Sequence, residues 1–589
     1  MKVRIYIDDR TYTKWTFNNL ENDEELETIE NSVLQSINPL EHKLFSKDIL
    51  LITGTKETSI SHETVYSSTK TNDKIAGVLI LENNKTYGRT ANKKRLLYKC
   101  IPDDKHLPVF LIPYDVKLGF SKFQKNKYVV FRYDHWQEKH PHAIITETIG
   151  DVDSLEAFYE YQLHCKSLNI SITEFTNNSK NTLKQHTPNE YMTRILETNP
   201  NIENHRNERV FTIDPPNSVD FDDGFSITMD KVTKICTITI YIANVYFWLD
   251  TLMLWKSFSK RVATIYLPDR RRPMLPTILS DNLCSLQENQ PRIAFFMRIR
   301  LDGTTGKIVG EPEYNNAIIN VTRNYKYEDG ELLNNDPCYE LLLRMTQKND
   351  KSVKTSNDVV SHWMVFMNKM TGLYMAKKQT GIFRATTYEP MTKREPMTPH
   401  DEEQEIQMLN EDTQRVIKSW NNNIGKYVIF EENKTSLAHH MMEGQYIHIT
   451  SPIRRIVDLL NQMIMFKTLN IVTLSVDAEQ FLLNWTEQIE YINTSMRSIR
   501  KIQTDCELIN RCFKDASIMN TEHVGVVFDK IVKNDGTNHY MVYLEKLKLL
   551  SRITTHVDVP VFSQRLFTMF LFEDEYRTKR KIRLQLKEN

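Results

Sequence analysis

Four aspartates lie within ten residues of one another in the segment VFTIDPPNSVDFDDGFSI, at positions Asp214, Asp220, Asp222 and Asp223. Unit charges about 4 Å apart repel by roughly 1 kcal/mol in water, and by more where solvent is excluded, so a compact carboxylate cluster favours a bound cation. Sites built only from oxygen ligands suit Mg²⁺, with Mn²⁺ as an alternative. The segment therefore predicts a divalent-cation site.

The same segment has a simpler interpretation as a solvated acidic turn. The hydrophobic runs RVFTI before it and FSITM after it argue against that interpretation, because they would hold the turn at the edge of a core. An EF-hand calcium loop does not fit, because that loop needs glycine at its sixth position and a distal glutamate, whereas Gly224 is fifth counting from Asp220.

The elements around the cluster divide the chain into several units. The first 165 residues contain short extended runs rich in β-branched and aromatic residues, such as KIAGVLIL and KYVVFRY, and these predict small β-barrels. Longer helical patterns mixed with strands begin near residue 206, and strand patterns return after 516. We expect an α+β multidomain protein with barrels at 1–70 and 71–165, a polar linker at 166–205, a large α/β domain at 206–516 and a third barrel at 517–589.

Composition limits the class of protein. The chain has 589 residues, with 76 Lys plus Arg and 76 Asp plus Glu, so whole-chain charge gives no sign of a polyanionic ligand. Its seven cysteines are odd in number and lack CxxC spacing, which argues against a disulfide framework or zinc sites. No apolar run approaches the roughly 20 residues that cross a bilayer. We expect an intracellular monomer without membrane contact, in the cytoplasm or alternatively the nucleus.

Several ordered motifs resemble the RNase II (RNB) family of exoribonucleases, in particular the type of the eukaryotic exosome catalytic subunit. They are IDPPNSVDFDD, RVATIYLPDRRRPMLPTILSDNLCSL, NVTRNYKYEDGELL and YIHITSPIRRIVDLLNQ. The segment from KIAGVLILENNKTYGR to HAIITETIG resembles the second cold-shock barrel of these enzymes. The resemblance implies two cold-shock-like OB barrels, an RNB catalytic domain and a carboxy-terminal S1-like OB barrel.

The resemblance also implies an activity. It is processive 3′-to-5′ hydrolysis of single-stranded RNA to nucleoside 5′-monophosphates by a two-metal-ion mechanism, with exosome-like or other RNA-decay proteins as partners. The alternative is a catalytically weakened RNB protein that serves as an RNA-binding or scaffolding factor. Retention of all four aspartates favours the enzyme, because a protein freed from metal binding would be expected to lose buried acidic residues.

By matching the family motifs, Asp214, Asp220 and Asp223 are expected to be metal ligands, and Asp222 to position the second metal or its attacking water. Arg454 matches the arginine that contacts the scissile phosphate, and its planar fork can engage two phosphate oxygens. Its neighbour Arg455 is expected to bind the RNA backbone. The pattern also predicts a helix that begins at Ser451 and Pro452, whose dipole would favour a phosphate.

Tyr266 and Tyr327 match family positions that stack on the terminal nucleotides, an interaction that tolerates any base. With 26 tyrosines in the chain, only the motif context singles these two out. In the second barrel, a basic and aromatic set predicts a further RNA-binding face, with solvation of a strand as the simpler alternative. Its members are Lys122, Lys125, Lys127, Arg132 and Trp136.

The chain also departs from the family pattern. Asn244 stands where the family usually has aspartate, the segment 349–361 is short, and the stretch 385–425 diverges and lacks a histidine after IFRA. These departures keep the alternative of a weakened enzyme open.

Overall fold

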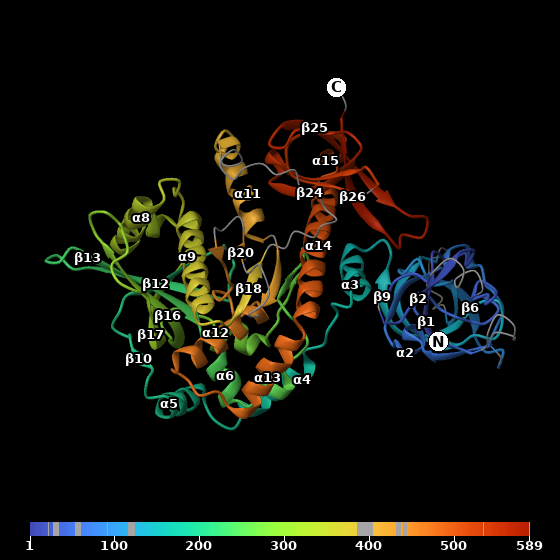
Figure 1. The fold of residues 1–589 in the computed structure, drawn as a ribbon, viewed down its shortest axis with the longest axis horizontal. Helices are drawn as coiled ribbons and strands as arrows, with labels where there is room; N and C mark the ends of the chain where they lie inside the picture. Colours follow the sequence, from blue (N-terminus) through green and yellow to red (C-terminus); the bar gives the residue numbers. More distant parts are fainter. Residues whose placement is uncertain are drawn as a thin grey trace.

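The computed structural model describes residues 1–21, 23–26, 34–53, 61–90, 92–115, 124–385, 404–423, 425–430, 438–439, 444–533 and 535–587. A large central domain has the amino-terminal β units on one side and the carboxy-terminal β unit above it (Figure 1). Within these ranges, no helix combines the length and the apolar character that a membrane span requires.

Two β units occupy the amino-terminal part. The first is a four-stranded sheet in the order β2-β1-β3-β4, and the second is a closed barrel in the order β5-β6-β7-β9-β8. Their strands are β1 (Lys2–Ile7), β2 (Trp15–Asn19), β3 (Ile49–Thr53), β4 (Ser61–Tyr66), β5 (Ile75–Leu79), β6 (Leu96–Pro102), β7 (Phe110–Tyr114), β8 (Lys127–His135) and β9 (His142–Asp151). The two units share one hydrophobic core, in which the rings of Phe45 and Phe110 stack with centroids 5.9 Å apart.

The segment expected to be a polar linker, 166–205, contains two helices, and its role as a linker stays a prediction. After α3 (Leu155–Cys165) it forms α4 (Thr173–Thr182) and α5 (Pro188–Thr198), and α5 begins at a capping box made by Thr187. Phe175 on α4 packs against Phe258 of the central domain, with ring centroids 5.1 Å apart. A few apolar residues at helical spacing therefore anchor a segment that is otherwise polar in composition.

The central domain contains a six-stranded sheet in the order β10-β17-β11-β12-β13-β16, and β16 also pairs with β17. Its strands are β10 (Glu203–Asn204), β11 (Val210–Asp214), β12 (Asp223–Met229), β13 (Ile235–Ala243), β16 (Pro291–Asp302) and β17 (Glu313–Lys326). The helices of this domain include α6 (Tyr246–Thr251), α7 (Gly330–Asn335), α8 (Pro337–Asn349), α9 (Ser356–Lys377), α11 (Glu411–Asn423), α12 (Ile456–Leu469), α13 (Val476–Glu487) and α14 (Ile489–Lys514).

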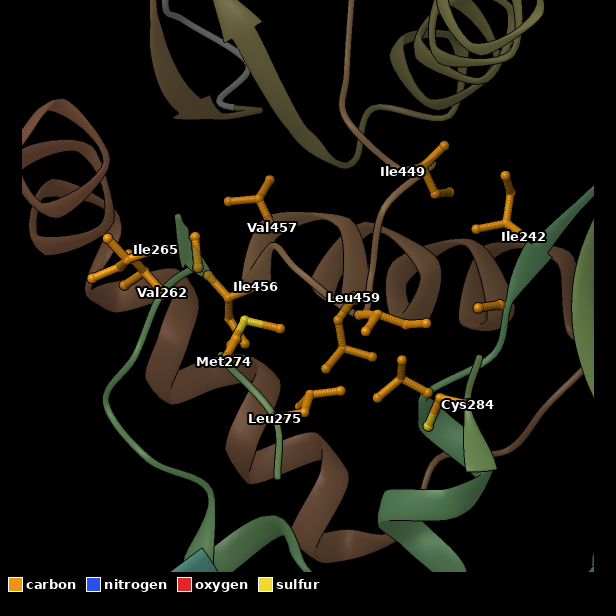
Figure 2. Close-up of a cluster of buried hydrophobic side chains, with 14 of the residues drawn as sticks. Ile242, Val262, Ile265, Met274, Leu275, Cys284, Ile449, Ile456, Val457 and Leu459 are labelled. Atoms are coloured by element: carbon orange, nitrogen blue, oxygen red, sulfur yellow. The ribbon is translucent and has the colours of Figure 1, made fainter. Parts of the chain in front are cut away.

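Helix α12 is the buried centre of this domain. Figure 2 shows its residues Ile456 and Leu459 close to Met274, Leu275 and Cys284, which come from the chain between β14 (Ile265–Tyr266) and β16. All five side chains are at most 2% exposed. Dense packing of this kind holds the turn before α12 rigidly, and that turn carries Arg454.

The carboxy-terminal unit is a five-stranded sheet in the order β24-β23-β22-β25-β26. Its strands are β22 (His523–Val532), β23 (Asn538–Leu544), β24 (Leu549–Thr555), β25 (Gln564–Glu573) and β26 (Arg580–Leu586). It touches the second amino-terminal unit, since Tyr128 donates a hydrogen bond to the carbonyl of Arg577 at 3.0 Å and Arg580 donates one to the carbonyl of Val152 at 3.0 Å. Small β units flank a mixed central domain, so the predicted fold class is confirmed. The exact domain limits stay predictions.

Candidate active site

Two neighbouring strands bring the acidic residues together. Asp214 is the last residue of β11 and Asp223 the first residue of β12, and the two strands are antiparallel neighbours. The connection from Pro215 to Asp222 carries Asp220. Because consecutive antiparallel strands end and begin at the same edge of a sheet, the local sequence alone places these carboxylates close together.

All four aspartates line a single cavity of about 560 Å³. Arg454 reaches it from the turn before α12, Tyr266 from β14 and Tyr327 from the chain after β17. The structure therefore unites seven predicted site residues from four separate segments. The cavity is also lined by residues that the motifs did not single out, namely Arg271 on the short strand β15 (Arg271–Arg272) and Asn357, Val360, Ser361 and Met364 on α9.

The carboxylates are buried without full compensation. Asp222 is 3% exposed and Asp223 is 8% exposed. One oxygen of each of Asp214, Asp222 and Asp223, the Oδ2 atom in every case, is buried and has no hydrogen bond. Burial raises the pKa of Asp222 to about 8, against the opposing influence of Arg454. Burial and the neighbouring Asp214 likewise raise the pKa of Asp223. Buried oxygens without partners are costly, so such a cluster indicates a site for a positively charged ligand.

Arg454 lies next to Asp222. Its Nε is 3.2 Å from Asp222 Oδ2, and the backbone N–H of Ile453 donates to Asp222 Oδ1 at 3.0 Å. The Arg454 side chain remains 47% exposed at the cavity. A guanidinium that is anchored on one edge and open elsewhere is suited to a phosphate.

The predicted helix start at Ser451 and Pro452 was wrong. Helix α12 begins at Ile456, and Arg455 occupies its N-cap position. Ser451 instead belongs to the preceding turn, where its carbonyl accepts hydrogen bonds from the N–H groups of Arg454 and Arg455 at 3.3 and 3.0 Å. The turn is held from α12 itself, because the Ser451 N–H donates to buried Asp458 at 2.8 Å. A side-chain anchor inside the helix thus replaces the expected cap.

Arg455 does not line the cavity. Its Nε and Nη2 contact the two carboxylate oxygens of Asp458, each at 2.8 Å. Asp458 is fully buried, so this bidentate pair satisfies a charge within the domain. The predicted contact of Arg455 with the RNA backbone finds no support in this geometry.

Both predicted tyrosines lie at the cavity. Tyr266 is 41% exposed and its hydroxyl donates to Asp220 Oδ2 at 3.2 Å. Tyr327 is half-buried, and its backbone N–H donates to the carbonyl of Asp214 at 2.8 Å. The two rings therefore flank the carboxylates, and their stacking on nucleotides stays a prediction.

The prediction that Trp136 belongs to an exposed RNA-binding face was wrong. Trp136 is 6% exposed and packs between the two amino-terminal units, with ring centroids 4.9 Å from Phe45 and 6.2 Å from Tyr12. Trp136 directly follows β8, and the local sequence could not reveal its burial, because the covering residues come from a different β unit. Of the basic residues predicted beside it, Lys125 and Lys127 form ion pairs with Asp153 and Asp151 at 3.1 and 2.5 Å. Lys122 lies outside the described residues.

Asn244 directly follows β13, the strand that pairs with β12, but it does not line the cavity. It is fully buried and its side-chain amide donates to Asn316 Oδ1 at 2.9 Å. The asparagine is therefore a satisfied part of the sheet.

The fit of a divalent cation can be tested on the oxygen atoms themselves. Across the part of the chain that the structure describes, no three or more His, Cys, Asp or Glu side chains are gathered in an arrangement that holds a metal ion. The donor chemistry nevertheless fits, because Asp214, Asp222 and Asp223 each offer a buried oxygen that lacks a hydrogen bond. Asp222 Oδ2 also lies 3.2 Å from Arg454 Nε, and Asp220 forms an ion pair with Arg271.

Comparison with known proteins agrees with this geometry. Residues 202–337 match the family described as RNB domain. The DIS3-like exonuclease 2 of Schizosaccharomyces pombe is 27% identical over 243 residues, which are 37% of this chain and 25% of that protein. The apo form of Mycoplasma genitalium RNase R superposes with a TM-score of 0.63 at 13% identity, covering 99% of this chain and 100% of the other. Yeast Ssd1, described as a pseudonuclease, superposes with a TM-score of 0.55 at 12% identity, covering 96% and 80%.

The central domain and its acidic cavity define an RNB-domain protein. Residues 202–337 match the RNB domain, and the fold is similar to that of RNase R, so the resemblance seen in the motifs is confirmed. The region matched by this chain covers 25% of the length of the Schizosaccharomyces pombe relative.

Proposed function

We propose that the protein is a 3′-to-5′ exoribonuclease that hydrolyses single-stranded RNA processively to nucleoside 5′-monophosphates. The observation that carries the proposal is the convergence of four aspartates and Arg454 on one cavity. Sequence similarity to a named exonuclease supports the same reaction class. Exosome-like or other RNA-decay proteins are the partners that we propose for this activity.

The residues of the chain divide the work of phosphodiester hydrolysis. Asp214, Asp222 and Asp223 supply the oxygens that would hold Mg²⁺ or Mn²⁺. Two such ions, when bound, supply Lewis-acid stabilisation and lower the pKa of a bound water. Arg454 presents its guanidinium to the scissile phosphate, and its contact with Asp222 fixes the orientation of that group.

The aromatic residues orient the substrate. Tyr266 and Tyr327 lie beside the carboxylates, where their rings can hold the terminal nucleotides by stacking. Stacking contributes about 1–3 kcal/mol per base and is tolerant of sequence, as required of an enzyme that digests any RNA. Two aromatic contacts would also hold the shortened strand between successive cleavages, which favours processive digestion.

A second candidate is an RNA-binding or scaffolding protein with weak hydrolysis. The specific observation in its favour is that Asp220 and Asp222 are paired with Arg271 and Arg454. Arginines can neutralise carboxylates that an efficient nuclease would leave to metal ions.

One assay separates the two candidates. A 5′-labelled single-stranded RNA is incubated with MgCl₂, and in parallel with a chelator. The exoribonuclease shortens the labelled strand to a small end product without intermediates, only with Mg²⁺, and leaves a circular RNA of the same sequence intact. The scaffolding protein shifts the RNA in a native gel without shortening it. Cleavage of the circular RNA would contradict an exonuclease.

A further inference from the structure

Asp220 differs from Asp214 and Asp223 in what its oxygens touch. Its Oδ1 lies 2.9 Å from Arg271 Nη1, and its Oδ2 accepts a hydrogen bond from the hydroxyl of Tyr266 at 3.2 Å. Both carboxylate oxygens therefore already have a partner within the protein. Asp214 and Asp223 each keep a buried oxygen without a hydrogen bond, whereas Asp222 contacts the N–H of Ile453 and the guanidinium of Arg454.

The partners of Asp220 are held by the short ribbon of β14 and β15. These strands pair in antiparallel register, which places Tyr266 directly opposite Arg271. Side chains opposite one another on an antiparallel pair lie close together, so both can reach the same carboxylate. The other end of the guanidinium is fixed as well, because Arg271 Nη2 bonds to Asp281. Arg271 therefore bridges two aspartates, and it lines the same cavity as Asp220 and Tyr266.

We propose that Arg271 is a positioning residue that removes Asp220 from the cation-binding set and makes it the anchor of Tyr266. The carboxylates that keep an oxygen open to a cation are then Asp214 and Asp223, and Asp222 is shared between the cation and Arg454. This inference rests on the proposed function, since it assigns the cavity to divalent cations and to an RNA end. It replaces the motif-based expectation that Asp220 is a metal ligand.

Electrostatic repulsion among the aspartates supports the pairing of Asp220 with Arg271 rather than with a cation. Four carboxylates in one cavity would repel one another, and the guanidinium of Arg271 compensates the one that lies nearest the ribbon. The hydroxyl of Tyr266 gains a fixed acceptor, which sets the direction of a ring that is 41% exposed at the cavity. Loss of Arg271 would leave Asp220 with one partner fewer and available to a cation.

The test measures Mn²⁺ binding in the full-length protein without RNA, by electron paramagnetic resonance titration. Asp223→Asn should weaken Mn²⁺ binding at least about tenfold, whereas Asp220→Asn should leave it within about twofold of the wild type. Arg271→Met should bind Mn²⁺ about threefold more tightly or better, because a further carboxylate becomes available. Arg271→Lys restores a positive charge beside Asp220 and should return the affinity to the wild-type value.

Matched controls keep the result interpretable. Arg300→Met removes another arginine of the central sheet, one that pairs with Glu313 and does not line the cavity. This variant should bind Mn²⁺ with wild-type affinity. Thermal melts confirm folding, and Asp214→Asn takes the place of Asp223→Asn if that variant does not fold. A loss of Mn²⁺ affinity in Asp220→Asn equal to that in Asp223→Asn overturns the inference, as does an Arg271→Met variant that binds no more tightly.

The RNA-shortening assay distinguishes failure of this inference from failure of the proposed function. If the wild-type protein shortens RNA in a metal-dependent way and Asp220→Asn loses Mn²⁺ binding, only the role assigned to Arg271 is refuted. If the variants show the predicted Mn²⁺ affinities but the wild-type protein leaves RNA intact, the proposed nuclease activity is refuted and the role of Arg271 stands. A wild-type protein that binds no Mn²⁺ refutes both.

Discussion

Two charged clusters lie on the central sheet, and they differ in how their polar atoms are satisfied. In the acidic cavity, three buried carboxylate oxygens have no hydrogen bond. In the other cluster, formed by Glu203, His205, Glu208, Tyr241 and Arg298, no buried side-chain N or O atom lacks one. His205 Nε2 lies 2.9 Å from Glu203 Oε2, and the hydroxyl of Tyr241 donates to Glu208 at 2.6 Å.

This difference separates a site from a structural network. Both clusters contain ionisable side chains in a partly buried setting, so residue type alone does not distinguish them. A closed network stabilises the sheet because every desolvated group recovers a partner. An open cluster costs stability until a ligand arrives, and that cost is tolerated where the protein works.

The largest expected effect is in the open cluster. Asp222→Asn should lower the rate of RNA shortening by more than about 10³-fold, because the amide cannot supply the anionic oxygen that holds a cation and orients Arg454. RNA affinity, measured by fluorescence anisotropy, should stay close to that of the wild type. Asp230→Asn in an exposed turn of the same sheet is the control. Unchanged single-turnover rates in Asp222→Asn would contradict the assignment.

Arg454→Lys should have the next largest effect on RNA shortening. A lysine keeps the charge but loses the planar fork, so kcat/KM should fall about 10²-fold. Arg300→Lys, an exposed arginine outside the cavity, should retain wild-type kinetics. Equal activity of the two variants would show that Arg454 acts only as a point charge.

The two clusters should also contribute differently to the pH dependence of the free energy of unfolding. The folded-state pKa of Asp222 is raised to about 8, above the value of about 3.9 in an unfolded chain, so its contribution to stability is present below pH 4 and is lost as pH rises through 8. In chelator, the free energy of unfolding should therefore fall with rising pH, by about 1.4 kcal/mol per pH unit for each such group.

Mn²⁺ should reverse that trend, because metal binding requires ionised carboxylates. Differential scanning fluorimetry across the pH range, with and without Mn²⁺, measures both slopes. Asp222→Asn should flatten the slope in chelator. A slope that is identical in the wild type and in Asp222→Asn would assign the pH dependence to other groups.

The smallest effect is expected in the closed cluster. Tyr241→Phe removes a hydroxyl that donates to Glu208 and lies 3.1 Å from His205 Nδ1, so the free energy of unfolding should fall by about 1–3 kcal/mol. Urea denaturation measures this loss, which should be the same with and without Mn²⁺. Tyr6→Phe, which removes an exposed hydroxyl bonded to Asp23, should cost less. A metal-dependent loss in Tyr241→Phe would erase the distinction between the two clusters.

Local patterns were sufficient for the parts of this protein that depend on neighbours in the chain. The aspartates of 214–223 lie between two hydrophobic runs, and those runs become adjacent strands β11 and β12. Motif resemblance added Arg454, Tyr266 and Tyr327, and all three line the cavity. Alternation of apolar residues likewise predicted the mixed fold, because strand and helix periodicities are encoded within a few consecutive residues.

Packing between distant segments decided the rest. The burial of Trp136 depends on Phe45 and Tyr12 from another β unit, and the anchoring of Ser451 depends on Asp458 in the first turn of α12. The partners of Asp220 lie on a ribbon that follows it by about 45 to 50 residues, so no local pattern could show that its oxygens were already taken. Which carboxylates stay open is a matter of three-dimensional contact, because hydrogen bonds and ion pairs form between atoms that folding brings within about 3 Å.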